Sequence, residues 1–436
     1  MQPENPVETT QADPRARKRP SAVRALRNRD YALYWSGLLI SATGSWMQNV
    51  AQGWLVFDLT GSKLYLGIVG AAGTLPMLFL ALPGGVIADR FNKRRIVIVT
   101  QTLALVQALI LGLLAVTHLV KPWHIVVLAS FSGLVNSLDV PARQAMTVEI
   151  VGKPDLMNAV ALNSSAFNGA RVFGPAIAGV IVAASGAGVC FLINAASYLA
   201  VIVSLLVIRP KPLRPSSKEV PMLEQIREGL GYSRRNAVIR DLLILTGVAS
   251  VFGLQYGTLV PALAKEVLGV GPKQFGLLVS AAGVGAVTAA LSIAAFGHLF
   301  IPRRIVAVGS ILAPVGIIAL STTQSYSFSV ACLVVIGFGM MLFLAVSNSI
   351  VQVASPDELR GRILSVRTLV FMGLAPLGAL QVGWLAQRFG VPRSLEIGGF
   401  ACLAAALYFA LRSRHSEHQT PFFTGLRMKE TGSLIL

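Results

Sequence analysis

Polar side chains recur at helical spacing inside several long apolar stretches of this chain. One face of a helix is marked by four of them at i, i+4, i+7 and i+11, namely Ser41, Ser45, Gln48 and Gln52. Amide and hydroxyl groups at such positions can hydrogen-bond a polar solute, and they seldom face hydrocarbon. The residues that we expect to line an internal cavity are Gln48, Asn49, Gln52, Asn136, Asn163, Asn168, Arg171, Gln255, Tyr256, Asn348 and Gln352.

Two charged residues lie among these polar faces. Asp139 is the one carboxylate placed well within an apolar stretch, so it could carry a proton or hold a neighbouring loop. Arg171 lies in the middle of a stretch, where a charge costs roughly 2.5–3.5 kcal/mol on membrane-insertion scales and needs water or a partner. It could attract an anionic solute or pair with Asp139. Hydrogen bonding between helices, without solute contact, is the alternative role for each polar residue.

The residues of an enzyme or of a cofactor site are missing from this pattern. The five histidines lie at the ends of apolar stretches or in the C-terminal tail, so no pair could hold haem within a membrane. No G-x-x-x-x-G-K-[ST] phosphate loop occurs, so the chain is not expected to hydrolyse ATP. The three cysteines lie in apolar stretches and imply no disulfide framework. We predict no enzymatic activity, no metal and no cofactor.

The composition places the apolar stretches in a membrane. Of 436 residues, 54% are hydrophobic and 13% are charged, and this charged share is about half that of a soluble domain. A helix of about 20 apolar residues crosses the bilayer. Stretches of this kind cover residues 31–57, 64–88, 96–117, 123–145, 158–184, 189–208, 241–264, 274–297, 305–321, 328–353, 364–387 and 394–411. The predicted fold class is therefore all-α integral membrane, with twelve transmembrane helices.

The cations lie mostly on one side of these spans. With both termini on the same side, that side carries 30 of the 37 lysines and arginines, Arg367 included. The opposite side carries six, and Arg171 alone remains within a span. Because cytoplasmic loops carry the excess of Lys and Arg, both termini are predicted to be cytoplasmic. The cations cluster between spans, so we expect contacts with anionic lipid headgroups and none with nucleic acid.

The two parts of the chain echo each other at an offset of about 200 residues. Leu66-Gly67 matches Phe275-Gly276, and Pro154-Asp155 matches Pro356-Asp357. Parallel repeats of this kind place a solute site at their interface. The predicted organisation is a cytoplasmic tail (1–30), a six-helix half (31–208), a cytoplasmic linker (209–240), a second six-helix half (241–411) and a cytoplasmic tail (412–436). A short amphipathic helix is predicted in the linker, lying on the cytoplasmic leaflet or within a solvated tether.

One charged loop resembles a known family. Residues 85–94, GVIADRFNKR, resemble the G-x-L-A-D-R-x-G-R-K loop that joins the second and third helices of major facilitator superfamily transporters. Asn92 and Lys93 depart from that pattern. The resemblance implies that Asp89 docks near the start of the eleventh span and that Lys93 reaches Asp139, which together hold the outward-facing state. The residues that it marks for gating or coupling are Gly85, Asp89, Arg90, Lys93, Arg94, Asp139 and Arg143.

A second motif resembles the fifth-helix signature of facilitator antiporters, G-P-x-x-x-G. It comprises Gly169, Gly174, Pro175 and Gly179. The glycines permit close packing against a neighbouring helix, while the proline frees a carbonyl and allows a bend. The stretches NRDY at 28–31 and LDVPARQ at 138–144 resemble the subgroup that holds drug, macrolide and siderophore exporters.

These resemblances imply a secondary active transporter in the cell (inner) membrane. It is expected to act as a monomer and to export a small amphipathic organic molecule, drug-like or siderophore-like, by proton antiport with alternating access. Few charges are predicted in the cavity, which favours bulky and mostly apolar cargo. The alternatives are an importer of a nutrient or metabolite with the same fold and, less favoured, an ion channel or a structural membrane protein.

Overall fold

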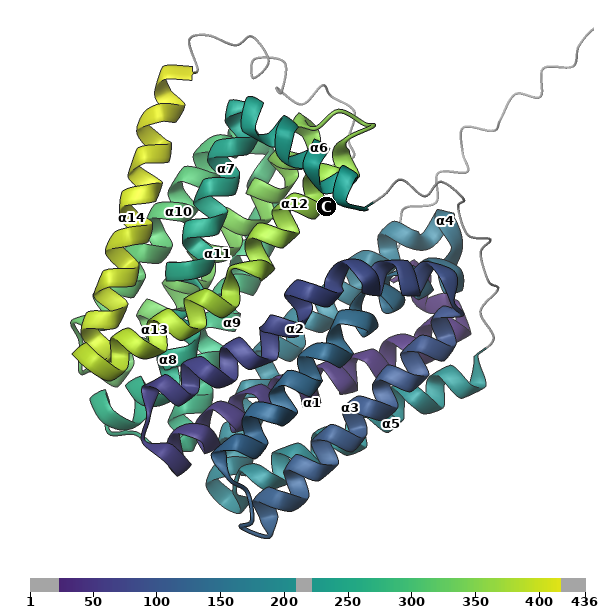
Figure 1. The fold of residues 1–436 in the computed structure, drawn as a ribbon, viewed down its shortest axis with the longest axis vertical. Coiled ribbons are helices and arrows are strands. Elements are labelled where there is room, and N and C mark those ends of the chain that lie inside the picture. The colour runs from purple at the N-terminus through teal and green to yellow at the C-terminus, as the bar shows by residue number, and fades with distance from the viewer. Residues whose placement is uncertain (1–22, 209–221, 417–436) are drawn as a thin grey trace, which may run out of the picture.

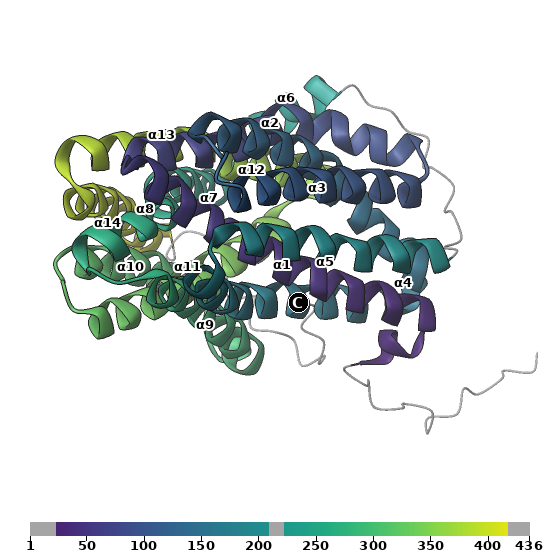
Figure 2. The ribbon, with the colours of Figure 1, turned by 90° about the horizontal axis from the view of Figure 1, so that it is seen from below.

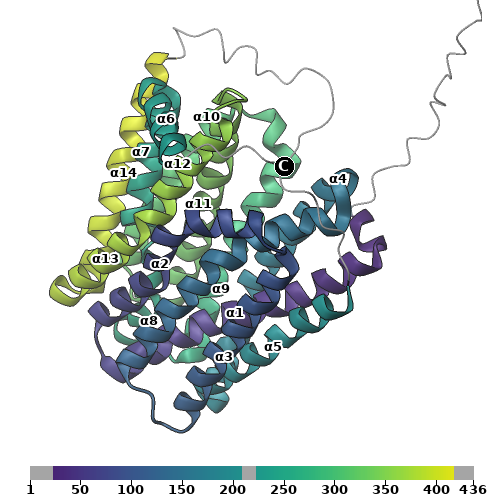
Figure 3. The ribbon, with the colours of Figure 1, turned by 45° about the vertical axis from the view of Figure 1, so that its right-hand side comes forward.

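The computed structural model describes the backbone of residues 23–208 and 222–416, and the side chains of these ranges except 81–90, 153, 222–226 and 413–416. All regular elements in the described ranges are helical. One bundle holds α1 (Arg29–Thr60), α2 (Lys63–Arg90), α3 (Lys93–Val116), α4 (Pro122–Ser185) and α5 (Ala187–Val207). The other holds α7 (Ala237–Val248), α8 (Tyr256–Ala262), α9 (Pro272–Phe296), α10 (Pro302–Ser321), α11 (Tyr326–Ala354), α12 (Arg360–Gly373), α13 (Ala375–Phe389) and α14 (Val391–Ser416). The two bundles are distinct in Figure 1, and they partly overlap in the turned views of Figure 2 and Figure 3.

Several spans are built from interrupted helices. Gly152, at a φ of 69°, breaks α4 into two spans, because glycine adopts this left-handed backbone at little cost. Short π-helical segments over Ala249–Gly253 and Leu263–Val267 flank α8, and such segments often occur at functional sites. A break at Leu374, before Pro376, separates α12 from α13.

The predicted fold class, an all-α integral membrane protein, is confirmed. Within the described residues, eleven helical segments are long and apolar enough to cross a membrane. The first predicted span, within α1, is not among them, although α1 is 32 residues long and packs against α4 and α5. The polar residues that it carries explain the difference. The count of twelve, and the exact limits of the two halves, stay predictions.

Apolar packing joins the two bundles at one end only. The largest cluster of buried apolar side chains includes Phe57 and Leu66 of the first bundle and Leu259 and Phe275 of the second. The other two clusters each stay within one bundle. Figure 1 shows the bundles meeting near α8 and α13 and diverging towards α6 and the far end of α4. The molecule is therefore closed at the end of α8 and open at the end of α6.

Glycines allow the close contacts at the closed end. A Cβ added to Gly276 of α9 would lie 2.4 Å from the carbonyl oxygen of Pro175 in α4. A Cβ on Gly67 of α2 would lie 2.5 Å from the carbonyl oxygen of Ala379 in α13. No larger residue fits these positions unless the backbones move apart. Two helix pairs, α4 with α9 and α2 with α13, therefore hold the halves together.

The linker helix α6 (Met222–Arg235) packs on the second bundle. A Cβ on Gly229 would lie 2.7 Å from the carbonyl oxygen of Arg362 in α12, and Glu228 forms an ion pair with Arg362. Neither interpretation of the linker, as a helix on the leaflet or as a solvated tether, anticipated this contact.

Candidate substrate cavity

A cavity of about 490 Å³ lies between the two bundles. Its walls come from α1, α2 and α4 on one side and mainly from α8 and α9 on the other. Apolar side chains such as Val69, Phe275 and Val279 make up much of the wall. Six residues predicted to line a cavity are in it, namely Gln48, Asn49, Gln52, Asn136, Arg171 and Tyr256. Polar residues of the first and fourth spans therefore converge here, as their spacing indicated, and the fifth span contributes Arg171.

The other five predicted lining residues lie outside this cavity. Asn163 accepts a hydrogen bond from the Tyr31 hydroxyl (2.9 Å), and Asn348 accepts one from Arg367 (3.1 Å). Gln255 donates to the Ser250 carbonyl (3.1 Å), and Asn168 donates to the Ser164 carbonyl (2.9 Å). Gln352 is exposed near the end of α11. Asn163 and Asn348 bond other helices, which is the alternative role for polar residues within a span, while Gln255 and Asn168 bond their own span.

Arg367 corrects the cation count. It was assigned to the cytoplasmic side, yet it lies within the segment Arg360–Phe389 that is apolar enough to span a membrane. Its guanidinium donates to the Leu344 carbonyl (3.2 Å) and the Ser347 hydroxyl (3.3 Å), besides Asn348. Arg367 therefore bonds α11 through its terminal nitrogens, while its Nε is buried without a hydrogen-bond partner among the described residues.

Gln48 lines the cavity, and its side chain is also hydrogen-bonded to two neighbouring helices of its own bundle. Its amide donates to Gln107 of α3 (3.1 Å) and accepts from Asn194 of α5 (2.7 Å). Asn194 also donates to the Tyr198 hydroxyl (3.3 Å). This buried network links three helices of the first bundle. Gln107, Asn194 and Tyr198 were not predicted as site residues from the sequence. Polar residues within the third and sixth predicted spans could have indicated them.

Arg171 faces the cavity beside an aromatic ring. Its guanidinium carbon lies 5.9 Å from the ring centroid of Trp46, within the range of a cation–π contact. The Trp46 ring packs edge-on against Phe167 at 5.8 Å. Gly174 makes room for this arrangement, because a Cβ there would lie 2.7 Å from the Cβ of Trp46. The structure records Asp139 pairing with Arg143, so the suggested pair of Arg171 with Asp139 is not formed.

Asp139 is buried and fully engaged in the first bundle. Its side chain is 1% exposed and lies 2.5 Å from the Arg143 guanidinium. It also accepts hydrogen bonds from Thr100 (2.6 Å) and Gln101 (3.0 Å) of α3. A buried carboxylate with one cation and two neutral donors is well compensated. Asp139 therefore ties α3 to α4.

The contact between Lys93 and Asp139, which the resemblance implies for the outward-facing state, is not formed in this structure. Lys93 instead lies 3.4 Å from Glu149, whose side chain is 5% exposed. The donors around Asp139 leave no place for a lysine, while Glu149 lies near the start of α3. Arg94 donates to the carbonyls of Leu205 (2.6 Å) and Leu206 (3.1 Å), which places a cation at the C-terminal end of α5. The side chains of Gly85, Asp89 and Arg90 lie outside the described residues, and their predicted roles stay predictions.

The glycines of the antiporter-like motif differ in their surroundings. A Cβ on Gly179 would lie 2.8 Å from the Pro272 carbonyl oxygen and 3.0 Å from the Gly276 Cα. Gly174 contacts α1, as described above. Gly169 has no described atom within 4 Å of such a Cβ, so its predicted role in close packing is wrong. The motif packs α4 on both α1 and α9.

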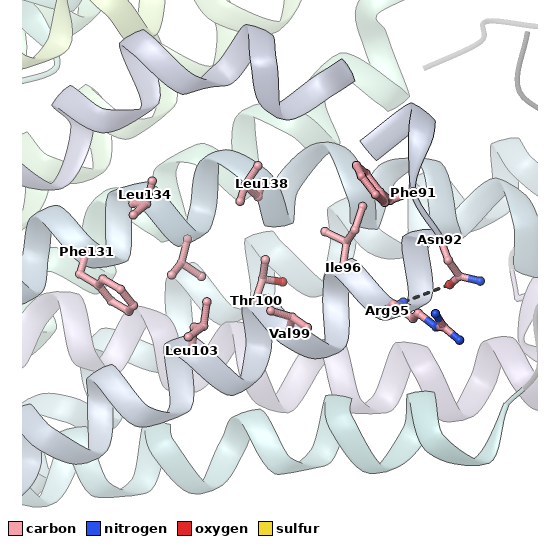
Figure 4. Close-up of a pocket in the computed structure, with 11 residues that line it drawn as sticks. Phe91, Asn92, Arg95, Ile96, Val99, Thr100, Leu103, Phe131, Leu134 and Leu138 are labelled. Carbon is pink, nitrogen blue, oxygen red and sulfur yellow. Dashed lines mark hydrogen bonds between the residues drawn. The ribbon is translucent and has the colours of Figure 1, made fainter. Parts of the chain in front are cut away.

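A second pocket of about 420 Å³ lies within the first bundle, between α3 and α4. Its lining is almost entirely apolar, as shown by Val99, Leu103 and Phe131 (Figure 4). Arg95 and Asn92 lie at the opposite end from Phe131 (Figure 4). No residue of the second bundle lines it. It therefore lacks the two-sided wall that a site between moving halves requires.

Known proteins match along most of the chain. A family model described as transmembrane secretion effector matches residues 20–424. A staphyloferrin A transporter of Staphylococcus aureus is 25% identical, over 87% of this chain and 96% of its own length. The multidrug efflux pump Tap of Mycolicibacterium fortuitum is 26% identical, over 81% and 88%. The enterobactin exporter EntS of Salmonella choleraesuis is 25% identical, over 82% of both chains.

Solved structures share the fold at low identity. A bacterial homologue of the human lysosomal transporter Spinster has a TM-score of 0.69 and 14% identity, covering 94% of this chain and 100% of that one. A POT family transporter in complex with 5-aminolevulinic acid has a TM-score of 0.72 and 13% identity, covering 89% and 96%. The two-bundle arrangement is therefore that of known transporters.

Proposed function

Because this chain belongs to the transmembrane secretion effector family of major facilitator transporters, we propose that it exports a small amphipathic organic molecule in exchange for protons. It is a multi-pass membrane transporter of small molecules, not an enzyme. The observation that supports export of an amphipath is the cavity between the halves, which combines aromatic and amide side chains. Its volume falls in the range of about 300–1,000 Å³ that is typical of small-molecule sites. Relatives that carry siderophores or drugs support the same cargo class.

Alternating access is proposed from the uneven contact between the halves. Apolar packing and glycine contacts hold one end shut, and each half has its own core at the other end. With both termini in the cytoplasm, as we propose from the distribution of cations, the open end faces the cytoplasm. Cargo would enter there and leave after the closed end opens. We also propose that the protein works as a monomer with its cationic loops near anionic lipid.

The proton is proposed to travel on a carboxylate outside the cavity. No carboxylate lines the cavity among the described residues. Asp139 is held by Arg143 and by two neutral donors, whereas Lys93, 3.4 Å away, is the one partner recorded for Glu149 among the described residues. Protonation of Glu149 would free Lys93 and loosen the contact between α3 and α4. Glu149 is therefore the better candidate for coupling.

Export should depend on the proton gradient and on the cavity. In everted vesicles with a fluorescent amphipathic dye added to the medium, we expect gradient-driven dye uptake that an uncoupler abolishes. Glu149→Gln should abolish this uphill uptake but retain exchange of dye down its gradient. Asn136→Trp, which fills the cavity, should abolish both while the protein remains folded. Dye movement that ignores the uncoupler would reject proton coupling, and full activity of Asn136→Trp would reject the cavity.

Ion pairs at the closed end should bias the two states. Asp58 lies 2.5 Å from Lys265, and Lys63 lies 2.7 Å from Glu266, so both pairs join the halves. Exposed pairs contribute only about 0–1 kcal/mol each, but reversing one charge turns attraction into repulsion. Lys63→Glu should therefore open this end several-fold more often, and adding Glu266→Lys should reverse the effect. Distances between spin labels on α1 and α8 report the opening.

The matched control is a pair within one half. Arg24 and Asp155 lie 2.9 Å apart in the first bundle, so Arg24→Glu should leave the distribution of spin-label distances unchanged. If the charge-swapped double variant stays as open as Lys63→Glu alone, the pair does not hold the closed end.

A further inference from the structure

One positive charge faces the cavity. Of the residues that line it, Arg171 alone carries a charged side chain, and the others are apolar or neutral and polar. No carboxylate of the described residues lies within ion-pair distance of its guanidinium, because the recorded pairs all involve other cations. Arg143 and Arg367, two other arginines within long apolar helical segments, both have partners in their own halves.

The position of Arg171 is fixed by its surroundings. The Trp46 ring lies beside the guanidinium, and Phe167 and Gly174 hold that ring in place. The backbone of Arg171 packs on α9, since a Cβ on Gly283 would lie 2.9 Å from its carbonyl oxygen. The charge therefore belongs to the interface between the halves, where a cargo must pass.

A guanidinium that lines a cavity without an ion-pair partner favours anionic ligands. Among the described residues, its guanidinium has the Trp46 ring beside it and no recorded anion, and a positive charge attracts an anion more strongly there than in bulk water. The planar fork of arginine matches a carboxylate with two parallel hydrogen bonds. Asn49, Gln52 and Asn136 supply neutral amides around it. Trp46 and Tyr256 supply flat apolar surface for a ring.

We propose that the cavity selects amphipathic organic anions. The anionic group binds the Arg171 guanidinium, and an aromatic or other apolar body packs near Trp46 and Tyr256. This assignment rests on the proposed export function and narrows its cargo to a charge class. Organic cations, which a cavity with an acidic wall would take, are repelled by the same charge.

Three probes of equal shape test the proposal. The naphthalene compounds 1-naphthoate, 1-naphthamide and 1-naphthylmethylammonium carry an anionic, a neutral and a cationic group on the same ring. Their binding to the full chain in lipid nanodiscs is measured by titration calorimetry at neutral pH. We expect naphthoate to bind about tenfold or more tightly than naphthamide, and the cation to bind weakest. Arg171→Gln should remove the preference, and Arg171→Glu should reverse it.

Two further variants separate the possible outcomes. Arg388→Gln removes an exposed cation outside the cavity and should leave the preference for naphthoate intact. Asn136→Trp should block all three probes. If the probes bind inside the cavity without a charge preference, or if Arg171→Gln retains it, the anion assignment is overturned while the cavity remains a binding site. If no probe binds and Asn136→Trp exports the dye normally, the proposed function falls as well.

Discussion

Gly179→Leu is expected to abolish export, whereas Gly169→Leu should leave it near the level of the unmodified protein. Both glycines belong to the same sequence motif, but only Gly179 lies against the other half of the molecule. A Cβ there would lie 2.8 Å from the Pro272 carbonyl and 3.0 Å from the Gly276 backbone, which cannot move away as a flexible side chain could. Overpacking typically costs about 1–3 kcal/mol, and every 1.4 kcal/mol shifts an equilibrium about tenfold.

The same change should alter which state the protein occupies. Because Gly179 contacts α9 at the closed end, its replacement disfavours the structure described here and favours one in which that end is open. Spin labels across the closed end should show longer distances in Gly179→Leu and unchanged distances in Gly169→Leu, alongside dye export in vesicles. Equal export by the two variants would mean that the halves do not need this close contact.

Asp139→Asn is expected to destabilise the protein strongly. The substitution keeps the shape of the side chain but leaves Arg143, whose side chain is 24% exposed, without its anion. Breaking one partner of a buried pair costs about 3–5 kcal/mol, and part of that is recovered here because Arg143 can reach water. The thermal midpoint of the protein in detergent should fall by several degrees, and its yield from membranes should decrease.

A double variant distinguishes a packing role from a role in proton transfer. Asp139→Asn combined with Arg143→Met removes both charges, so much of the stability should return. Export should return with it if Asp139 serves to join α3 to α4. Restored stability without uphill export would instead assign the proton to Asp139 and contradict the structural role. Thr100→Val, which removes one neutral donor to the same carboxylate, should have a smaller effect than Asp139→Asn.

The spans could be predicted from the sequence because the bilayer sets their length and composition directly. Runs of about 20 apolar residues separated by charged loops have few other solutions. The exception is informative, since the polar face of α1 lowers its hydropathy for the same reason that it lines the cavity. The converging polar faces of α1 and α4 were also predictable, since helical spacing decides which residues share a face.

Partners within the membrane were less predictable. Spacing shows that Gln48 and Asn163 each share a face with other polar residues, but not whether that face meets water or another helix. Gln48 does both, whereas Asn163 accepts a hydrogen bond from Tyr31, which is 132 residues away in the sequence. From the sequence, Lys93 could pair with either Asp139 or Glu149 of α4. Only the folded structure shows that Asp139 is occupied by other partners and that Lys93 lies beside Glu149. Gly169 and Gly179 belong to the same sequence motif, but only Gly179 packs closely against another helix.

In the proposed transport cycle, the single charged residue that lines the cavity would couple the movement of the two halves to the membrane potential. Moving one elementary charge across the full potential involves about 2.3 kcal/mol per 100 mV, and a cavity that changes sides carries Arg171 through part of that drop. With the predicted orientation and a negative interior, the voltage draws the empty, positively charged cavity towards the cytoplasm, where cargo is collected. In the proposed cycle, an anion bound at Arg171 cancels that charge. The membrane potential then does not oppose the change of the loaded protein to the outward-facing state. The voltage then resets the transporter without acting against its export step.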